Sequence, residues 1–499
     1  MKKFLLLVLS LVLMLSITVS FSACGDKDLP NEVDLSDEED TEQDPDAALY
    51  QNLNKANYAA GGSPMEFNIL HNISNYGLVT MEAEMNGVKI DEAIYERNRF
   101  IEEQLGIVFN VESDTYSSIP GRVTNDVMGG LHYYHICYNE SYKQTELALQ
   151  GAYRSVNDYE DYIDFEMPWW YQDVLDDTTI AGNNFLIAGD MSMMLNDAVW
   201  CIAFNRRIIQ DHGGSDPFAL VREGKWTYEE LYKLSKDTLV DGRYGIVSHY
   251  GVSAAFVVGG DQTLIVKDTD GGLVHNSFGD RFVSIYQDVV RKFFEKNGVG
   301  EENCIRTSTT SQNYLINESY TGFNEMDTFT SGQATFVGQV LGSFRQSLPH
   351  AEIDYGIVPM PKYEETQKNY VSLISRSGSL CGVLASVEDE DGMLERVCNI
   401  LEWFNAYSYK YVLPVYYDVI LTGRIARNAE TAEMLDIICA LTENSVKRTE
   451  LDGLYNFGMT GVLQLYASDC KPNISTGMQG LYGSIENKIR TMTDYYKYN

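Results

Sequence analysis

Basic residues are scarce in this chain. Its 499 residues include 37 Lys and Arg against 72 Asp and Glu, so the formal net charge is -35 at pH 7. Proteins that bind nucleic acids neutralise phosphates with clustered Lys and Arg. The deficit therefore argues against a nucleic acid partner.

Recognisable catalytic motifs are also missing. The sequence has no G-x-S-x-G, no H-E-x-x-H and no G-x-x-x-x-G-K-[ST]. His132 and His135 are three residues apart, but on the strand expected here they point to opposite faces, so we expect no shared metal. The sequence indicates neither a cofactor nor an enzyme. A carboxylate pair at glycosidase spacing stays open, because sequence spacing does not reveal one.

The cysteines form neither a disulfide framework nor a zinc signature. Of the eight, Cys24 directly follows an N-terminal signal pattern over residues 1–23, which leaves seven others, an odd number without a C-x-x-C pair. We expect most of the seven to be small buried hydrophobes: Cys137, Cys201, Cys304, Cys381, Cys398, Cys439 and Cys470.

Only one long apolar run is present, and it is at the N-terminus. Lys2 and Lys3 precede an uncharged stretch that ends in small residues before Cys24. This is the pattern of a secretory signal peptide over residues 1–23. The position of Cys24 resembles a bacterial lipobox, which implies lipidation of Cys24, cleavage before it and a lipid anchor on the extracellular face of the cell membrane. The alternative is an ordinary exported protein. Removal of the two lysines takes the net charge from -35 to -37.

An acidic segment follows the leader. Residues 25–47 are dominated by Asp and Glu and contain little that could enter a core. Such a segment cannot bury enough apolar surface to offset its ordering entropy. We therefore expect residues 24–64 to be the lipidated cysteine and a disordered tether. The rest of the chain has no second apolar run long enough to cross a bilayer. Its apolar content is sufficient for two lobes, each with its own core.

The periodicity of the remaining chain predicts an α/β fold. Residues 65–70 alternate like a strand, residues 90–105 carry an apolar helical stripe that ends at Gly106, and residues 107–111 read as a strand again. This order predicts a βαβ unit and a parallel sheet. Residues 131–138 predict another strand. Since ligands bind beyond the carboxyl ends of such strands, we expect a site in the loops after Leu70 and Tyr138.

Later segments carry local signals as well. Thr227 and Glu230 form a capping-box pattern, with Trp226 placed to pack on Leu231. Residues 354–361 and 380–385 predict strands. The pattern is mostly helical from Leu394 onward.

Aromatic residues gather at points that suit a polar ligand with flat apolar faces. Trp169, Trp170 and Tyr171 follow a proline on a predicted loop, and Trp200 precedes a predicted strand. Sugar sites combine such rings with a few placed polar groups. Packing between lobes is the alternative role for the double Trp. Trp403 lies among helical apolar positions and is expected in the core.

Several of these segments together resemble an extracellular solute-binding protein of an ABC importer, of the large sugar-binding type found in Gram-positive bacteria. The resemblance spans most of the chain from Met65 and rests on the order of the following segments: the lipobox, RNRFIEEQLGI, PWW at 168–170, CIAFNRRII, GKWT, GQATF and DYGIVPMPKY.

The resemblance implies a two-lobe, periplasmic-binding-protein-like (type II, Venus-flytrap) fold with an interlobe cleft and a helical C-terminus. Lobe one would comprise residues 65–203 and 334–384, and lobe two residues 204–333 and 385–499. It also implies sugar contacts at Asn139 and Glu140. At the segment where relatives often place a stacking aromatic, this chain has Gln339.

These observations predict a monomeric, lipid-anchored protein that captures an extracellular solute and delivers it to ABC permease subunits. An oligosaccharide is the expected solute, with peptides and other polar solutes open. The alternatives are a cell-surface glycoside hydrolase or lyase, and a glycan-capturing lipoprotein without a permease. Closure of the two lobes on the ligand would be a population shift.

Overall fold

The computed structural model describes residues 53–498, apart from residues 74–80, 82, 240–242, 250, 270, 277–278, 295–304, 309–323, 390–391 and 470. The predicted signal peptide, Cys24, the predicted tether as far as residue 52, Cys304 and Cys470 lie outside the described residues.

The first sheet has four strands in the order β12-β3-β1-β2. Strand β1 pairs in parallel with β2 and β3, and β12 pairs antiparallel with β3. The helix between β1 and β2 ends at Gly106, whose φ of 64° is a left-handed conformation that glycine adopts without steric cost. The elements are β1 (Met65–Asn72), α3 (Lys89–Leu105), β2 (Ile107–Asp114), α4 (Ile119–Val127), β3 (Ile136–Glu140), α5 (Ser141–Ala148) and β12 (Ser379–Val383).

The second sheet has five strands in the order β10-β4-β9-β5-β8. Strand β5 runs parallel to β8 and β9, whereas β4 runs antiparallel to β9 and β10. Its elements are β4 (Trp200–Asn205), α8 (Arg206–Asp211), α9 (Pro217–Arg222), α10 (Tyr228–Asp237), β5 (Tyr244–His249), α11 (Val252–Gly259), α12 (Asp280–Val289), η1 (Val290–Phe294), β8 (Ile305–Ser308), α13 (Glu325–Thr330), β9 (Ala334–Val340), α14 (Leu341–Ser347), η2 (Leu348–His350) and β10 (Tyr355–Pro359).

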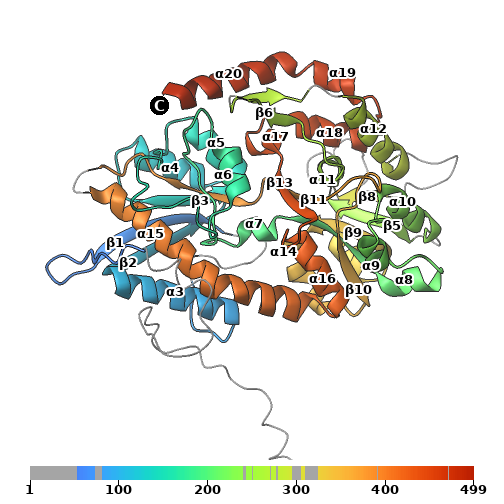
Figure 1. Ribbon diagram of the computed structural model, residues 1–499, viewed down its shortest axis with the longest axis horizontal. Helices are drawn as coiled ribbons and strands as arrows, with labels where there is room; N and C mark the ends of the chain where they lie inside the picture. Colours follow the sequence, from blue (N-terminus) through green and yellow to red (C-terminus); the bar gives the residue numbers. More distant parts are fainter. Residues whose placement is uncertain are drawn as a thin grey trace, which may run out of the picture. The chain divides into compact units, whose positions relative to one another are not determined.

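Several segments connect the two sheets. The chain crosses from the first sheet to the second just before β4. It crosses again at β11 and at β13, which pair in parallel, and along helix α15 with its π-helical continuations η4 and η5 (Figure 1). The buried carboxylate of Asp197 fastens this region, because it pairs with Arg345 at 2.8 Å and accepts a hydrogen bond from Tyr416. The connecting elements are α6 (Gln172–Thr178), α7 (Met194–Asp197), β11 (Tyr370–Ile374), α15 (Met393–Tyr407), η4 (Ser408–Val412), η5 (Val415–Ile425), α16 (Ala429–Ile438) and β13 (Ser445–Thr449).

The C-terminal part is helical. Helix α18 packs on α11, and α20 lies beside the small β6–β7 hairpin, as Figure 1 shows. These elements are β6 (Ile265–Lys267), β7 (Leu273–His275), α17 (Leu451–Leu454), α18 (Met459–Ser468), α19 (Ile474–Gln479) and α20 (Tyr482–Tyr498).

Most predicted elements are present, but the strand predicted over residues 131–138 is wrong in its first half. Strand β3 begins only at Ile136, and His132 has a φ of 50°. The reason is Asp126, whose carboxylate accepts hydrogen bonds from the Tyr133 and Tyr134 backbone N–H groups. These groups therefore do not pair with a strand. His135 accepts a hydrogen bond from the backbone N–H of Asn68.

The predicted lobe boundaries also need correction where the second sheet is concerned. The prediction placed residues 334–384 in lobe one, yet β9 and β10 pair with β4 inside the second sheet. The boundary predicted at residue 203 falls in the middle of β4. Helix α15, predicted for lobe two, packs on α3 beside the first sheet. Pairing partners far apart in sequence decided each of these assignments.

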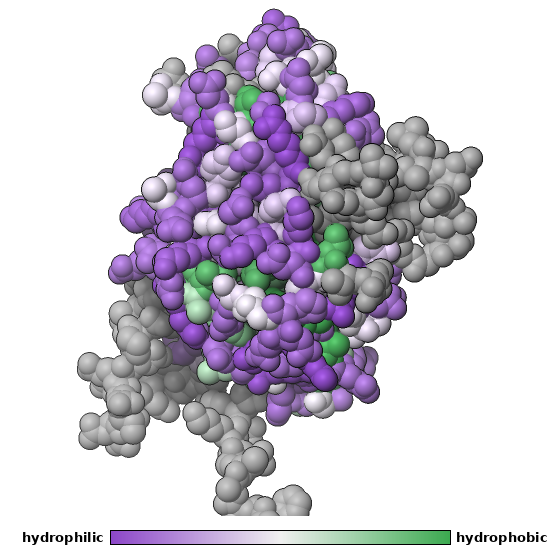
Figure 2. All heavy atoms as spheres, turned by 90° about the vertical axis from the view of Figure 1, so that its right-hand side faces the viewer, coloured by the Kyte–Doolittle hydropathy of each residue, from purple (hydrophilic) through white to green (hydrophobic). Residues whose placement is uncertain are grey.

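The surface is largely hydrophilic, as the high content of charged residues suggests, and most cysteines are buried. The face in Figure 2 is mostly hydrophilic, with a few hydrophobic side chains gathered in its lower half. The prediction that cysteines are buried hydrophobes is confirmed for five that are free and buried: Cys137, Cys201, Cys381, Cys398 and Cys439. In the part of the chain that is described, no helix has the length and apolar character needed to cross a membrane.

Candidate functional site

The carboxyl ends of the parallel strands carry polar side chains in both sheets. Strand β3 ends at Glu140, β5 ends at His249, and Gln339 is the next-to-last residue of β9. Because β4 runs antiparallel to β9, its first residue Trp200 pairs with Val340 and lies at this same edge. These edges are where open α/β sheets bind ligands.

Arg376 lies near both edges. It lies in the loop between β11 and β12, and its guanidinium carbon is 4.8 Å from the centre of the Tyr142 ring. Its positive charge also lowers the pKa of His249 in the second sheet. Ser141 holds the loop by donating a hydrogen bond to the Arg376 carbonyl at 2.9 Å. We call the following group the interlobe cluster: Glu140, Tyr142, Trp200, His249, Glu325, Gln339 and Arg376.

The half of the interlobe cluster on the second sheet is ordered by contacts among its own side chains. Gln339 Nε2 donates to Glu325 Oε1 at 2.9 Å. The Trp200 and His249 rings are tilted at 42° with centroids 6.4 Å apart. His249 Nδ1 accepts a hydrogen bond from the Gly251 backbone N–H at 3.2 Å. The Gly251 hydrogen bond thereby orients the His249 ring next to the Trp200 ring.

Burial keeps two members of the interlobe cluster uncharged at neutral pH. It lowers the pKa of His249, and Arg376 lowers it further while Glu325 opposes the shift. It raises the pKa of the Tyr142 hydroxyl, and the Glu140 carboxylate adds to the rise. Neutral donors and acceptors beside an aromatic ring and a guanidinium are suited to hydrogen bonding with hydroxyl groups.

The predicted residues Asn139 and Glu140 lie at the end of β3, but they differ in their partners. The Asn139 side chain donates to the Tyr116 carbonyl at 3.1 Å and accepts from the Glu140 backbone N–H at 2.8 Å. The Asn139 side-chain amide therefore forms its hydrogen bonds within the protein, to backbone groups at the sheet edge. Glu140 is 4% exposed, and its charge raises the pKa of the Tyr142 hydroxyl. Their contact with ligand stays a prediction.

The two tryptophans predicted as a stacking platform lie inside the protein. Trp169 and Trp170 are 1% and 2% exposed, and their indole N–H groups donate to the two carboxylate oxygens of Glu402 at 3.1 and 3.0 Å. Glu402 belongs to α15. This arrangement leaves no open ring face and favours the packing role over the platform.

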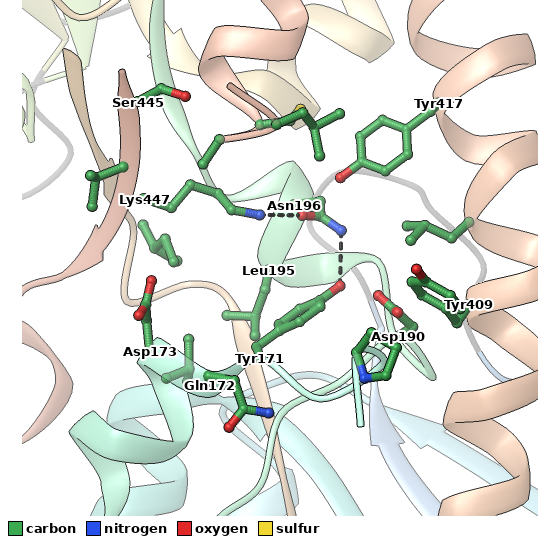
Figure 3. A pocket seen from close by; sticks show the side chains of 18 residues that line it. Tyr171, Gln172, Asp173, Asp190, Leu195, Asn196, Tyr409, Tyr417, Ser445 and Lys447 are labelled. Carbon is green, nitrogen blue, oxygen red and sulfur yellow. Dashed lines mark hydrogen bonds between the residues drawn. The ribbon is translucent and has the colours of Figure 1, made fainter. Parts of the chain in front are cut away.

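Tyr171, the third residue of that segment, lines a cavity of about 400 Å³ (Figure 3). We call this space the tyrosine cavity, after Tyr171, Tyr409 and Tyr417 in its wall. Its lining comes from the segments that connect the two sheets, including Asn196 before β4 and Lys447 in β13. It shares no lining residue with the interlobe cluster.

Sequence reasoning missed Tyr142, His249, Glu325 and Arg376. One of them had a readable signal, because the polar run Ser375-Arg376-Ser377 directly follows the apolar strand β11. Tyr142 lies just beyond the predicted Asn139 and Glu140, whereas His249 ends β5 and Glu325 begins α13, two elements that the sequence did not predict. No group of three or more His, Cys, Asp or Glu side chains among the described residues could hold a metal ion.

The fold is that of two-lobe sugar-binding proteins of ABC transporters. The sugar-binding protein MalE from Xanthomonas citri is similar with a TM-score of 0.57 and 12% identity, over 87% of this chain and 100% of that chain. The cyclic α-maltosyl-1,6-maltose-binding protein from Arthrobacter globiformis is similar with a TM-score of 0.55 and 11% identity, over 88% and 100%. An ABC substrate-binding protein from Listeria monocytogenes, in complex with cycloalternan, gives 0.54 and 12%, over 86% and 99%.

This likeness confirms the predicted α/β, two-lobe Venus-flytrap fold. The sequence comparisons add no assignment. No family model matches the chain. No curated protein matches it either.

Proposed function

We propose that the protein is the substrate-binding component of an ABC importer and captures an oligosaccharide between its two lobes. The observation that carries the proposal is the interlobe cluster, in which Arg376 draws together side chains at the carboxyl-end edges of both sheets. A ligand held there contacts both lobes, and such contacts favour the closed state. The similar structures named above are described as maltose-type or cyclic-sugar-binding proteins, which supports an oligosaccharide as the solute.

The proposed partners are ABC permease subunits, to which the closed complex would deliver its ligand. We also propose that the protein is monomeric and is held at the extracellular face of the cell membrane by a lipid on Cys24. The signal pattern of residues 1–23 supports the anchor.

The test is binding of a panel of maltodextrins and cyclic glucans by calorimetry and thermal shift. A true ligand at about a hundredfold excess over its dissociation constant adds about 2.7 kcal/mol of apparent stability. Arg376→Ala should weaken that binding at least about tenfold, or about 1.4 kcal/mol, because it removes a guanidinium that packs on Tyr142 and whose charge acts on His249 at the other edge.

Arg207→Ala is the matched control, since the Arg207 side chain on α8 is 83% exposed and far from any strand end that we assign to the site. It should bind as the unaltered protein does. Equal affinities for the Arg376 and Arg207 variants would contradict the assignment of the site. Shortened sugar products in the incubated samples would contradict a pure binding function.

A further inference from the structure

The tyrosine cavity is lined by residues that do not belong to the interlobe cluster. Its walls come from α6, the segment before β4, η4 and η5, the end of α16 and β13. Much of the wall is apolar, with Leu195, Ile374, Leu413 and Val446 among its residues. A volume of about 400 Å³ is within the range of small-molecule sites.

Asp190 is a buried carboxyl group in this wall. The residue is 1% exposed, and its Oδ1 atom has no hydrogen-bond partner among the residues that the structure describes. Figure 3 shows the carboxyl group between the Tyr171 hydroxyl and Tyr409. A buried acceptor without a partner costs free energy that a suitable donor would recover.

The neighbouring polar groups are already committed to one another. Lys447 Nζ donates to Asn196 Oδ1 at 3.0 Å, and Asn196 Nδ2 donates to the Tyr171 hydroxyl at 3.0 Å. The Lys447 ammonium is 5.6 Å from the centre of the Tyr171 ring, and its charge also acts on the Asp190 carboxyl group. The Tyr171 hydroxyl keeps its own proton and acts on the Asp190 carboxyl group as a hydrogen-bond donor, while Asp190 Oδ1 has no partner among the described residues.

Burial decides the charge state of this carboxyl group when nothing is bound. It raises the pKa of Asp190 to about 7, while the Tyr171 hydroxyl and the Lys447 charge act in the opposite direction. A cation placed next to Asp190 would favour its ionised form. The aromatic faces around the carboxyl group favour a cation as well.

We propose that the tyrosine cavity binds a small organic ammonium compound with an apolar body, whose ammonium group donates to Asp190. The apolar wall receives the body of the ligand, and the tyrosine rings surround the charge. This site is separate from the proposed oligosaccharide site, with which it shares no residue, and it does not depend on that function.

Phenethylammonium is the probe, and phenethyl alcohol and phenylacetate are its neutral and anionic counterparts. Calorimetry at neutral pH should give saturable binding of phenethylammonium at one site. Its affinity should exceed that of both counterparts at least about tenfold, since only the ammonium makes a charge-assisted hydrogen bond to a carboxylate. Equal binding of alcohol and ammonium would overturn the proposal without any variant. No saturation of phenethylammonium binding up to about 10 mM would also overturn it.

Asp190→Asn keeps the size of the side chain and removes its charge, so it should weaken phenethylammonium binding at least about tenfold. Asp211→Asn on α8 is the matched control, because the Asp211 side chain is 64% exposed and outside the cavity. It should bind the amine unchanged. Equal loss in both variants would point to non-specific attraction by the acidic surface and overturn the proposal.

Discussion

At the scale of single residues, Glu402 of α15 is an acidic group held inside the protein. Its carboxyl group is buried and accepts hydrogen bonds from the indole N–H groups of Trp169 and Trp170. Burial raises its pKa to about 8, the nearby Asp164 charge adds to the rise, and the two indole donors oppose it. The pair of tryptophans therefore depends on an acidic residue more than two hundred positions away.

The raised pKa of Glu402 predicts a pH-dependent stability. The folded protein holds a proton on Glu402 up to about pH 8, whereas the unfolded chain releases it near the ordinary value of 4.5. This group therefore contributes stability that is lost as the pH rises from about 4.5 to about 8. Glu402→Gln, which stays neutral, should gain about 4 kcal/mol relative to the unaltered protein between about pH 5 and about pH 8, since each pH unit contributes about 1.4 kcal/mol. Urea unfolding at several pH values measures the difference.

Glu402→Ala is the comparison for that experiment. It leaves two buried indole N–H groups without an acceptor, and each costs about 1–3 kcal/mol. We expect it to be less stable than Glu402→Gln at every pH, with unaltered oligosaccharide affinity. Parallel stability curves for the unaltered protein and Glu402→Gln would show that the carboxyl group does not titrate in this range.

At the scale of elements, the start of α10 shows how local sequence and packing agree. Thr227 is the N-cap, and its hydroxyl accepts a hydrogen bond from the Glu230 backbone N–H at 3.4 Å. Trp226 is fully buried and donates to the Pro359 carbonyl of β10 at 2.9 Å. The predicted structural role of Trp226 is therefore confirmed.

Removing the cap should weaken α10 and the sheet that it covers. Thr227→Ala should lower the free energy of unfolding by about 1 kcal/mol, because an orphan backbone N–H loses its acceptor. Thr227→Ser keeps the hydroxyl and should stay within about 0.5 kcal/mol of the unaltered protein. Chemical denaturation of both variants checks this. A stable Thr227→Ala variant would mean that packing of Trp226 alone holds the entry to the helix.

At the scale of the whole molecule, the proposed anchor and the net charge act together. The excess of acidic residues would be repelled by anionic lipids, so the protein surface adds no attraction to the membrane. Retention at the membrane should therefore depend wholly on lipidated Cys24. Cys24→Ala should appear in the medium or stay uncleaved with the membrane, as fractionation and the mass of the N-terminus would report. A correctly cleaved variant that still fractionates with membranes would rule the anchor out.

Local sequence was sufficient to predict the elements whose bounds are set by their own residues. The apolar stripe and Gly106 define α3, the alternation of residues 65–70 defines most of β1, and the capping residues define α10. The order of strand, helix and strand also predicts the parallel pairing of β1 with β2. Each of these signals depends on residues only a few positions apart, so no knowledge of distant partners is needed.

The sequence by itself determined the α/β class, the export signal pattern, the strongly acidic composition and the presence of the aromatic segment at 168–171. Only the tertiary structure decided which rings are buried, since Trp169 and Trp170 meet Glu402 of α15 while Tyr171 faces the tyrosine cavity. It also decided that Arg376, from the loop after β11, packs on Tyr142 at the edge of the first sheet, while its charge lowers the pKa of His249 at the edge of the second. The physical reason is that hydrogen-bond partners and buried surfaces come from segments hundreds of residues apart, which local periodicity does not encode.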